Sequence, residues 1–241
     1  AIYFGNDNIK EIYVGSDKIK EVYYGSEKVW GKIESIQEGY WVHKDTGVIT
    51  YFDADADFIT NGIMSQPSWK DDCSEVQIPS GVTGLGDRCF FNCPSLTSIN
   101  IPEGVISLGD RCFLSCGSLT SITLPEGIVS LGESCFSGCA SLTSITLPES
   151  VVSLGDFCFE HCSSLTSITI PESVTIIGSN CFEFCTSLTL ATVLPAIPPT
   201  LGSSAFFIVH SSFNIKVRSP YVDAYKAATN WTAYAAKISA I

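Results

Sequence analysis

The chain of 241 residues carries a formal net charge of −12, from 13 basic and 25 acidic residues, and no lysine or arginine cluster is present. This charge argues against a nucleic-acid partner and against binding to an anionic membrane. Membrane insertion is not expected, because no apolar run reaches the length of about 18 residues that a spanning helix needs. The first residues, AIYFGNDNIK, also lack the basic start and apolar run of a secretory signal, which indicates a chain made in the cytosol or one whose signal was cleaved.

Residues 1–32 contain a repeat of ten residues, read as IYFGNDNIKE, IYVGSDKIKE and VYYGSEKVWG. Short β-prone runs separated by Gly-Asn-Asp or Gly-Ser-Asp predict strands joined by tight turns. A β element this small is marginal alone, so we expect it to pack on the rest of the chain, on copies of itself as in a trimer, or on another protein. The candidate docking residues are the aromatic side chains of the repeat, Tyr3, Tyr13, Tyr23 and Trp30.

Residues 33–72 are not repetitive, and we expect them to form a β-hairpin and a linker that cap the following repeats. The hairpin is predicted from GYWVHKDTGVITYF, with strands near 40–44 and 48–52. Alternating aspartates at 53–57 invite a calcium interpretation, but the glycine and glutamate that an EF-hand loop requires are missing. A solvated acidic turn is therefore favoured, and no metal site is predicted.

Residues 73–218 follow a 23-residue period, with four near-identical copies between Cys89 and Asn180, for example CFLSCGSLTSITLPEGIVSLGES. A unit of this length cannot bury its apolar face alone, so each unit is one coil of a solenoid and stacks on identical neighbours. Within a coil, Ile99 and Ile101 alternate with polar residues as in a half-buried strand, and Pro102 ends that strand.

The remainder of each coil predicts a short helical turn. In the segment from Cys112 to Cys116, the i, i+4 spacing places both cysteines on one face of such a turn, beside Phe113. The same register extends upstream to Val76 and, after a one-residue insertion, downstream to Val217. The prediction is an α+β solenoid with about seven stacked short strands.

Residues 219–241 predict a helical cap at the C-terminal end of the solenoid. Ser219-Pro220 is typical of a helix start, and Asn230 is expected to interrupt the helix before a second apolar stripe that begins at Trp231. Such a piece would cover the last coil, whose core and strand edge are otherwise open.

Ten of the eleven cysteines form five Cys-x-x-x-Cys pairs, for which disulfides, zinc binding and simple packing compete as explanations. Zinc is disfavoured because His43, His161 and His210 do not stand at ligand spacing. The sixth coil has Ala205 and Val209 in the two cysteine positions, which indicates slots selected for size and polarity. Buried free thiols are therefore predicted, with no metal and no cofactor.

No catalytic motif is present: there is no GxSxG elbow, phosphate loop, dinucleotide fingerprint or HExxH, so no catalytic residue is assigned. The polar lattice on the strand face could suit ice, but it suits any solvated strand equally well. The coils differ mainly between their paired cysteines, and a recognition surface is expected there and in the loop 207–212. The candidate binding residues are Phe91, Asn92, Leu114, Glu160, His161, Glu183 and Phe184.

The unit SLTSITLPEGIVSLGESCFSGC resembles the BspA-like leucine-rich repeats, also called the Treponema pallidum type, and the C-terminal RSPYVDAYKAATNWTAYAAKI is similar to the usual end of such proteins. This resemblance covers 73–241 and implies a solenoid used for adhesion and recognition rather than catalysis. Cysteine replaces the alanine that usually precedes phenylalanine in the family. The N-terminal IYVGSDKIKEVYYGSEKVW is similar to decapeptide repeats of phage and prophage structural proteins.

Together these resemblances predict a non-enzymatic virion component, a fibre or decoration protein of a phage that infects gut bacteria and is made in the host cytoplasm. Its N-terminal repeats would bind other virion proteins, and its solenoid would contact a host surface protein or glycan. One alternative is a bacterial cell-surface adhesin whose export signal was removed. A further alternative is a structural protein that only caps a larger assembly.

Overall fold

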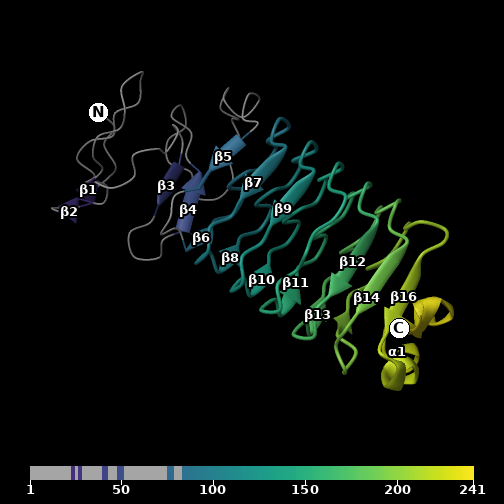
Figure 1. The fold of residues 1–241 in the computed structure, drawn as a ribbon. Helices are drawn as coiled ribbons and strands as arrows, with labels where there is room; N and C mark the ends of the chain where they lie inside the picture. The colour runs from purple at the N-terminus through teal and green to yellow at the C-terminus, as the bar shows by residue number, and fades with distance from the viewer. Residues whose placement is uncertain (1–22, 25–26, 29–39, 43–47, 52–74, 79–82) are drawn as a thin grey trace.

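The computed structural model describes residues 23–24, 27–28, 40–42, 48–51, 75–78 and 83–241 (Figure 1). Of the predicted docking element, it describes only β1 (Tyr23–Tyr24) and β2 (Glu27–Lys28), which pair antiparallel. Three of the predicted docking residues, the acidic run 53–57 and one cysteine lie outside the described residues: Tyr3, Tyr13, Trp30 and Cys73.

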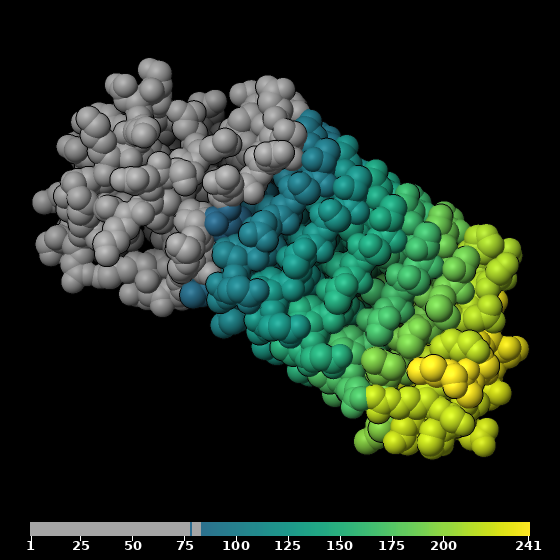
Figure 2. Space-filling view, in the orientation of Figure 1, coloured from purple at the N-terminus to yellow at the C-terminus, as the bar shows by residue number. Residues whose placement is uncertain are grey.

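Stacked coils form the body of the molecule, and Figure 2 shows them as parallel bands running across the surface. Parallel strands from successive coils form a first column, in which equivalent residues such as Ile99 and Ile122 are paired. The predicted alternation is confirmed at Ile99 and Ile122, each of which is buried between two outward polar residues. The strands of this column within the solenoid are β5 (Glu75–Gln77), β7 (Ser98–Asn100), β9 (Ser121–Thr123), β12 (Ser167–Ile170), β14 (Leu190–Val193) and β16 (Asn214–Val217).

The first column is divided into a 3-stranded and a 4-stranded sheet. Between them, residues 144–146 follow the same path without strand pairing, although Ile145 and Leu147 stay buried. The two sheets together have seven strands, as predicted in number. One of them is β17 (Ile238–Ala240) of the C-terminal segment, which pairs parallel with β16, whereas the coil that contains residues 144–146 contributes no strand.

A second column of two-residue strands runs along another side of the coils and was not predicted. Five ladders in register join its members, such as Leu108 with Leu131. At its N-terminal end, β3 (Tyr40–Val42) and β4 (Val48–Tyr51) pair antiparallel, and β4 pairs with the first short strand, so the sheet has 8 strands. The short strands are β6 (Gly84–Leu85), β8 (Ser107–Leu108), β10 (Ser130–Leu131), β11 (Ser153–Leu154), β13 (Ile176–Ile177) and β15 (Thr200–Leu201).

The predicted helical turn between paired cysteines is wrong. In the second clear copy, the N–H of Phe113 donates to the carbonyl oxygen of Cys135 in the next coil (2.7 Å), whereas the N–H of Cys116 donates to Phe113 (3.2 Å). Amides therefore point alternately along the solenoid and back into their own turn, which an α-helix does not allow. Two residues per turn have positive φ, 59° at Arg111 and 64° at Ser115, so the segment is a pair of tight turns.

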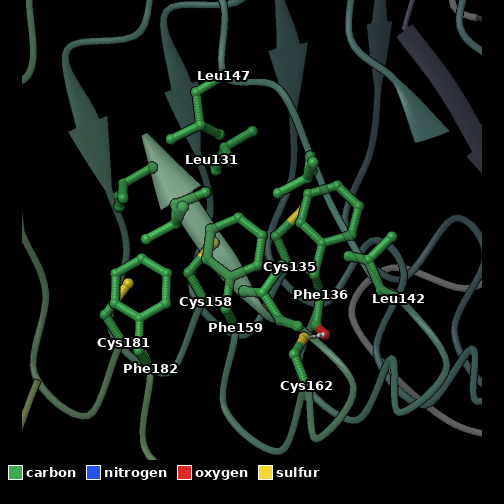
Figure 3. Close-up of a cluster of buried hydrophobic side chains, with 14 of the residues drawn as sticks. Leu131, Cys135, Phe136, Leu142, Leu147, Cys158, Phe159, Cys162, Cys181 and Phe182 are labelled. Carbon is green, nitrogen blue, oxygen red and sulfur yellow. Dashed lines mark hydrogen bonds between the residues drawn. The ribbon is translucent and has the colours of Figure 1, made fainter. Parts of the chain in front are cut away.

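The core is a set of side-chain columns that run the length of the solenoid. One phenylalanine from each coil stacks on the next, with ring centroids 5.1–5.5 Å apart and planes within 9°. Figure 3 shows three of these rings, Phe136, Phe159 and Phe182, beside the leucines and thiols that surround them. All of these side chains are buried, because each coil supplies the apolar surface that its neighbours cover.

The C-terminal segment is only partly helical. It comprises η2 (Ser219–Tyr221), α1 (Val222–Ala227) and η3 (Trp231–Lys237) before β17, and Asn230 interrupts it with φ of 63°. Two buried aromatics anchor it: the Tyr225 hydroxyl donates to the Pro195 carbonyl and Trp231 Nε1 to that of Pro199, both at 2.8 Å. This segment covers the last coil with these rings and covers its strand edge with β17. No helix in the described residues is long and apolar enough to cross a membrane.

Candidate functional site

Three positions lie between paired cysteines: the first holds the buried phenylalanine, and the other two form the turn face. A backbone ladder sets the order of the side chains on this face. The N–H groups of Asn92, His161 and Phe184 each donate to the residue beside them in the next coil, at 2.7, 2.9 and 3.0 Å. The seven predicted binding residues therefore lie in two neighbouring columns on one face. Turn column 1 is Phe91, Leu114, Ser137, Glu160, Glu183 and Phe207, and turn column 2 is Asn92, Ser115, Gly138, His161, Phe184 and Ile208.

Every residue of turn column 2 adopts the left-handed backbone conformation. Its φ is 73° at Gly138, where no Cβ is present, but also 59° at Phe184 and 51° at Ile208. A positive φ is uncommon for any residue with a side chain, and it is an outlier for a bulky or β-branched one. The backbone ladder repeats this conformation in every coil, so Phe184 and Ile208 are held in it at the C-terminal end of the face, where the side chains are largest.

We call this C-terminal end the turn patch; it consists of Glu160, His161, Glu183, Phe184, Phe207 and Ile208. The rings of His161 and Phe184 stack with centroids 4.5 Å apart and planes 4° apart. Beyond them, Phe207 is 52% and Ile208 46% exposed. An aromatic and apolar surface is thus available to a partner, and the order of the two columns follows from the backbone ladder beneath it.

Carboxylates border the rings of the turn patch. Glu160 accepts a hydrogen bond from the Ser137 hydroxyl (3.2 Å), and Glu183 accepts one from the side-chain amide of Asn180. No lysine or arginine occurs between residues 112 and 215, and at the C-terminal end Lys216 and Lys237 donate to the carbonyl oxygens of Ala240 and Phe213. The arrangement can offer aromatic faces and hydrogen-bond acceptors to a ligand, but it has no cationic group for an anionic one.

The remaining predicted residues, Phe91, Asn92 and Leu114, are half-buried at the N-terminal end of the turn face. The coil of Ser137 and Gly138, which presents only small side chains, separates them from the turn patch. The sequence prediction thus groups residues that share a face but lie in two clusters. Phe207 and Ile208 could be placed in these columns because the sixth coil keeps the repeat after its one-residue insertion.

The ten cysteines in the paired positions contribute to the core. The ten in the paired positions are free and buried, which confirms the prediction for these ten. In four coils the second thiol donates to the carbonyl oxygen of the phenylalanine in the preceding coil, at 3.0–3.3 Å, a role that sequence reasoning missed. Burial also raises the pKa of Cys162 well above its usual value, so the neighbouring His161 does not activate a nucleophile there.

Metal chemistry finds no support among the described residues, where no group of three or more His, Cys, Asp or Glu side chains could hold an ion. Carboxylates do recur along the solenoid, but they serve the backbone. Asp110 Oδ1 accepts the N–H of Glu133 (2.8 Å), and Asp156 Oδ1 accepts that of Ser179 (2.6 Å). Asp110 and Asp156 therefore each link two neighbouring coils.

Comparison with known proteins agrees with this architecture. Six copies of the BspA type leucine rich repeat region match the chain, over residues 68–189 and 108–219. No curated protein matches significantly. The solved leucine-rich repeat protein of T. pallidum is 22% identical and superposes with a TM-score of 0.54, covering 82% of this chain and 91% of its own, which shows the fold.

Two further solved structures are similar, with lower TM-scores. A leucine-rich repeat protein of Bacteroides ovatus is 22% identical, with a TM-score of 0.39, and covers 76% of this chain and 71% of its own. A leucine rich cell surface protein of Faecalibacterium prausnitzii is 28% identical, with a TM-score of 0.42, covering 66% and 54%. The family repeat spans more than half of the sequence, and the coils, stacked rings and parallel strands follow it: the chain belongs to the BspA type leucine-rich repeat family.

Proposed function

We propose that this protein is a non-enzymatic binding protein that recognises a surface ligand, a protein or a glycan, through the turn patch. Members of the BspA type leucine-rich repeat family are typically binding or structural proteins, and no catalytic family is indicated. The observation that carries the proposal is the contrast between a core that repeats from coil to coil and a turn patch that does not. There, the backbone ladder places the rings of His161 and Phe184 in a stack at the surface.

The chemistry of the turn patch suits a partially apolar, neutral or basic ligand. Aromatic rings supply large contact area with little side-chain entropy to lose, which is why they dominate recognition hot spots. Glu160 and Glu183 lie on the same coils as His161 and Phe184 and can accept hydrogen bonds from hydroxyl or amide donors. The strand face, by contrast, presents serine and threonine without aromatic anchors.

The test compares the full chain with the double variant His161→Ala/Phe184→Ala on a printed array of bacterial and host glycans and on immobilised surface proteins. We expect retention by a subset of these probes and at least a tenfold loss in the variant, since two hot-spot rings are each worth on the order of 1–2 kcal/mol. Thr146→Ala, on the strand face, is the matched control. Equal retention of all three proteins would contradict the proposal and favour a purely structural capping role.

Two locations are proposed for this binding protein. Proteins of this family are commonly bacterial surface proteins, which supports a cell-surface adhesin. The similarity of residues 1–32 to decapeptides of phage structural proteins supports a virion component instead, bound to other virion proteins through Tyr3, Tyr13, Tyr23 and Trp30 or assembled as a trimer. Buried free thiols suit either synthesis in the host cytosol or a protected core. Mass spectrometry of purified phage particles and of protease-shaved cell surfaces distinguishes the two, because the intact chain or its peptides should occur in one fraction.

A further inference from the structure

The second strand column carries an exposed apolar stripe, which we define as Ile106, Val129, Val152 and Ile176. These side chains are 56%, 51%, 39% and 48% exposed, respectively. The first three occupy one position in successive coils, because the N–H of Val129 donates to Ile106 (3.2 Å) and that of Val152 to Val129 (2.8 Å). Ile176 belongs to the adjacent position, one coil further on, where it pairs with Ser153. The stripe lies apart from the turn face along the coil.

The fold does not require apolar side chains in this stripe. The same position is threonine in the flanking coils, Thr83 and Thr175, and the backbone ladder continues through both. Threonine is β-branched and suits an extended backbone as well as valine or isoleucine does, so strand propensity does not explain the choice. Leaving aliphatic groups in water while a soluble alternative fits is a sign of an interaction surface.

Two rows of carboxylates accompany the stripe. In successive coils a glutamate, Glu126 or Glu149, stands three residues before the apolar residue, and an acidic residue, Glu133 or Asp156, stands four residues after it. In each coil the chain runs from the glutamate through the apolar residue and the short strand to the second acidic residue, so the two rows flank the stripe along the coil. Arg111 forms an ion pair with Glu133, but no lysine or arginine occurs between residues 112 and 215, so Glu126, Glu149 and Asp156 keep the surface beside the apolar stripe negative.

The spacing of the stripe fits an α-helix lying along the solenoid. Neighbouring strands of a hydrogen-bonded ladder lie about 4.8 Å apart, and the stacked rings of the core are 5.1–5.5 Å apart. An α-helix advances about 5.4 Å per turn, so one apolar side chain per turn meets one coil of the stripe. Basic residues on either side of the helix's apolar face would then lie over the carboxylate rows.

We propose that the apolar stripe is a docking surface for a basic amphipathic α-helix of a partner protein. A second copy of this chain is a poor occupant, because two such surfaces face to face would oppose carboxylates to carboxylates. Nucleic acids and anionic lipids are disfavoured for the same reason. The stripe is only a few coils long, so the complex is a weak, transient one, with a dissociation constant on the order of micromolar.

The experiment uses the full chain and a fluorescein-labelled synthetic peptide of about four helical turns, with leucine on one face and lysine on both flanks. Fluorescence anisotropy should show saturable binding that weakens as salt screens the lysine–carboxylate attraction. Val129→Thr/Val152→Thr, which introduces the residue found at Thr175, should weaken binding about tenfold or more, as expected when buried methyl groups are lost. Glu126→Gln/Glu149→Gln should weaken it severalfold and flatten the salt dependence.

The controls keep the result interpretable. Ile197→Thr removes an aliphatic residue outside the stripe that is 82% exposed, and it should leave binding unchanged, as should the turn-patch variant His161→Ala/Phe184→Ala. Equal binding of a peptide with glutamate in place of lysine, or of one with the same residues scrambled, overturns the proposal. So does unaltered binding by both stripe variants. A dimer in sedimentation velocity that Val129→Thr/Val152→Thr abolishes would assign the surface to a second copy and also overturn it.

Discussion

Replacing Phe136 by alanine tests the stack of rings that runs through the core. Phe136 is fully buried, with its ring 5.2 Å from Phe113 and 5.5 Å from Phe159. Truncating a buried phenylalanine costs about 3–5 kcal/mol, a range that includes the cavity left behind. An interior coil cannot close that cavity without shifting both neighbours, so we expect a loss of about 5 kcal/mol in the free energy of unfolding, a third or more of a typical domain's stability.

Urea unfolding followed by far-ultraviolet circular dichroism provides the measurement, with the m-value as a check on the extent of unfolding. Phe136→Leu keeps most of the apolar volume but loses both ring pairs, so its cost should be about 2 kcal/mol. Phe207→Ala, at an exposed phenylalanine of the turn patch, should change stability by no more than about 0.5 kcal/mol. A loss for Phe136→Ala within about 1 kcal/mol of the Phe207→Ala value would refute the idea that the stack stabilises the solenoid.

Three further predictions concern the thiols, the coil contacts and the cap. Burial raises the pKa of the Cys185 thiol from its ordinary 9.0 to about 12, so the unfolded chain loses this proton first as pH rises; stability should be full below about pH 9 and fall toward pH 12 in urea titrations, while a flat profile would contradict it. A Cβ on Gly132 would lie 2.7 Å from the backbone nitrogen of Asp110, so Gly132→Ala should cost about 1–3 kcal/mol, whereas Gly117→Ala, with open space around it, should be near neutral by the same assay. Trp231→Phe removes a buried indole hydrogen bond, so it should lower the free energy of unfolding by about 1–3 kcal/mol and with it the thermal midpoint. An unchanged midpoint would show that the cap does not hold the last coil.

The repeat period is enough to predict the strand register. Val76 pairs with Ile99 and Ala191 with Ile215, the second pair across the one-residue insertion, because in-register stacking places like residues over like residues. The buried faces follow for the same reason, as does the free state of the cysteines, which the substitution of alanine and valine in the sixth coil indicates. On the turn face, the sequence identifies the positions that vary but cannot show which of them touch.

Other features depend on contacts between coils that a single repeat does not reveal. The spacing of Cys112 and Cys116 is compatible with a helix and with two tight turns, and the choice rests on amides that donate into the next coil. The second strand column uses only two residues per coil, such as Ser107 and Leu108, too few to give a visible alternation. The apolar stripe beside them was missed because it leaves no periodic pattern within a coil. Each member is a single exposed residue in its coil, and only stacking of the coils makes the members contiguous.

Because each coil bonds only to the coil before and the coil after it, whole coils are interchangeable units. Unequal recombination between the nearly identical gene segments that encode them would add or delete complete turns of the rod without disturbing a single ladder or ring pair. Every such event would change the reach of the molecule by about 5 Å and leave its terminal structures intact. Length is therefore a property that this architecture can vary in evolution independently of what its surfaces bind.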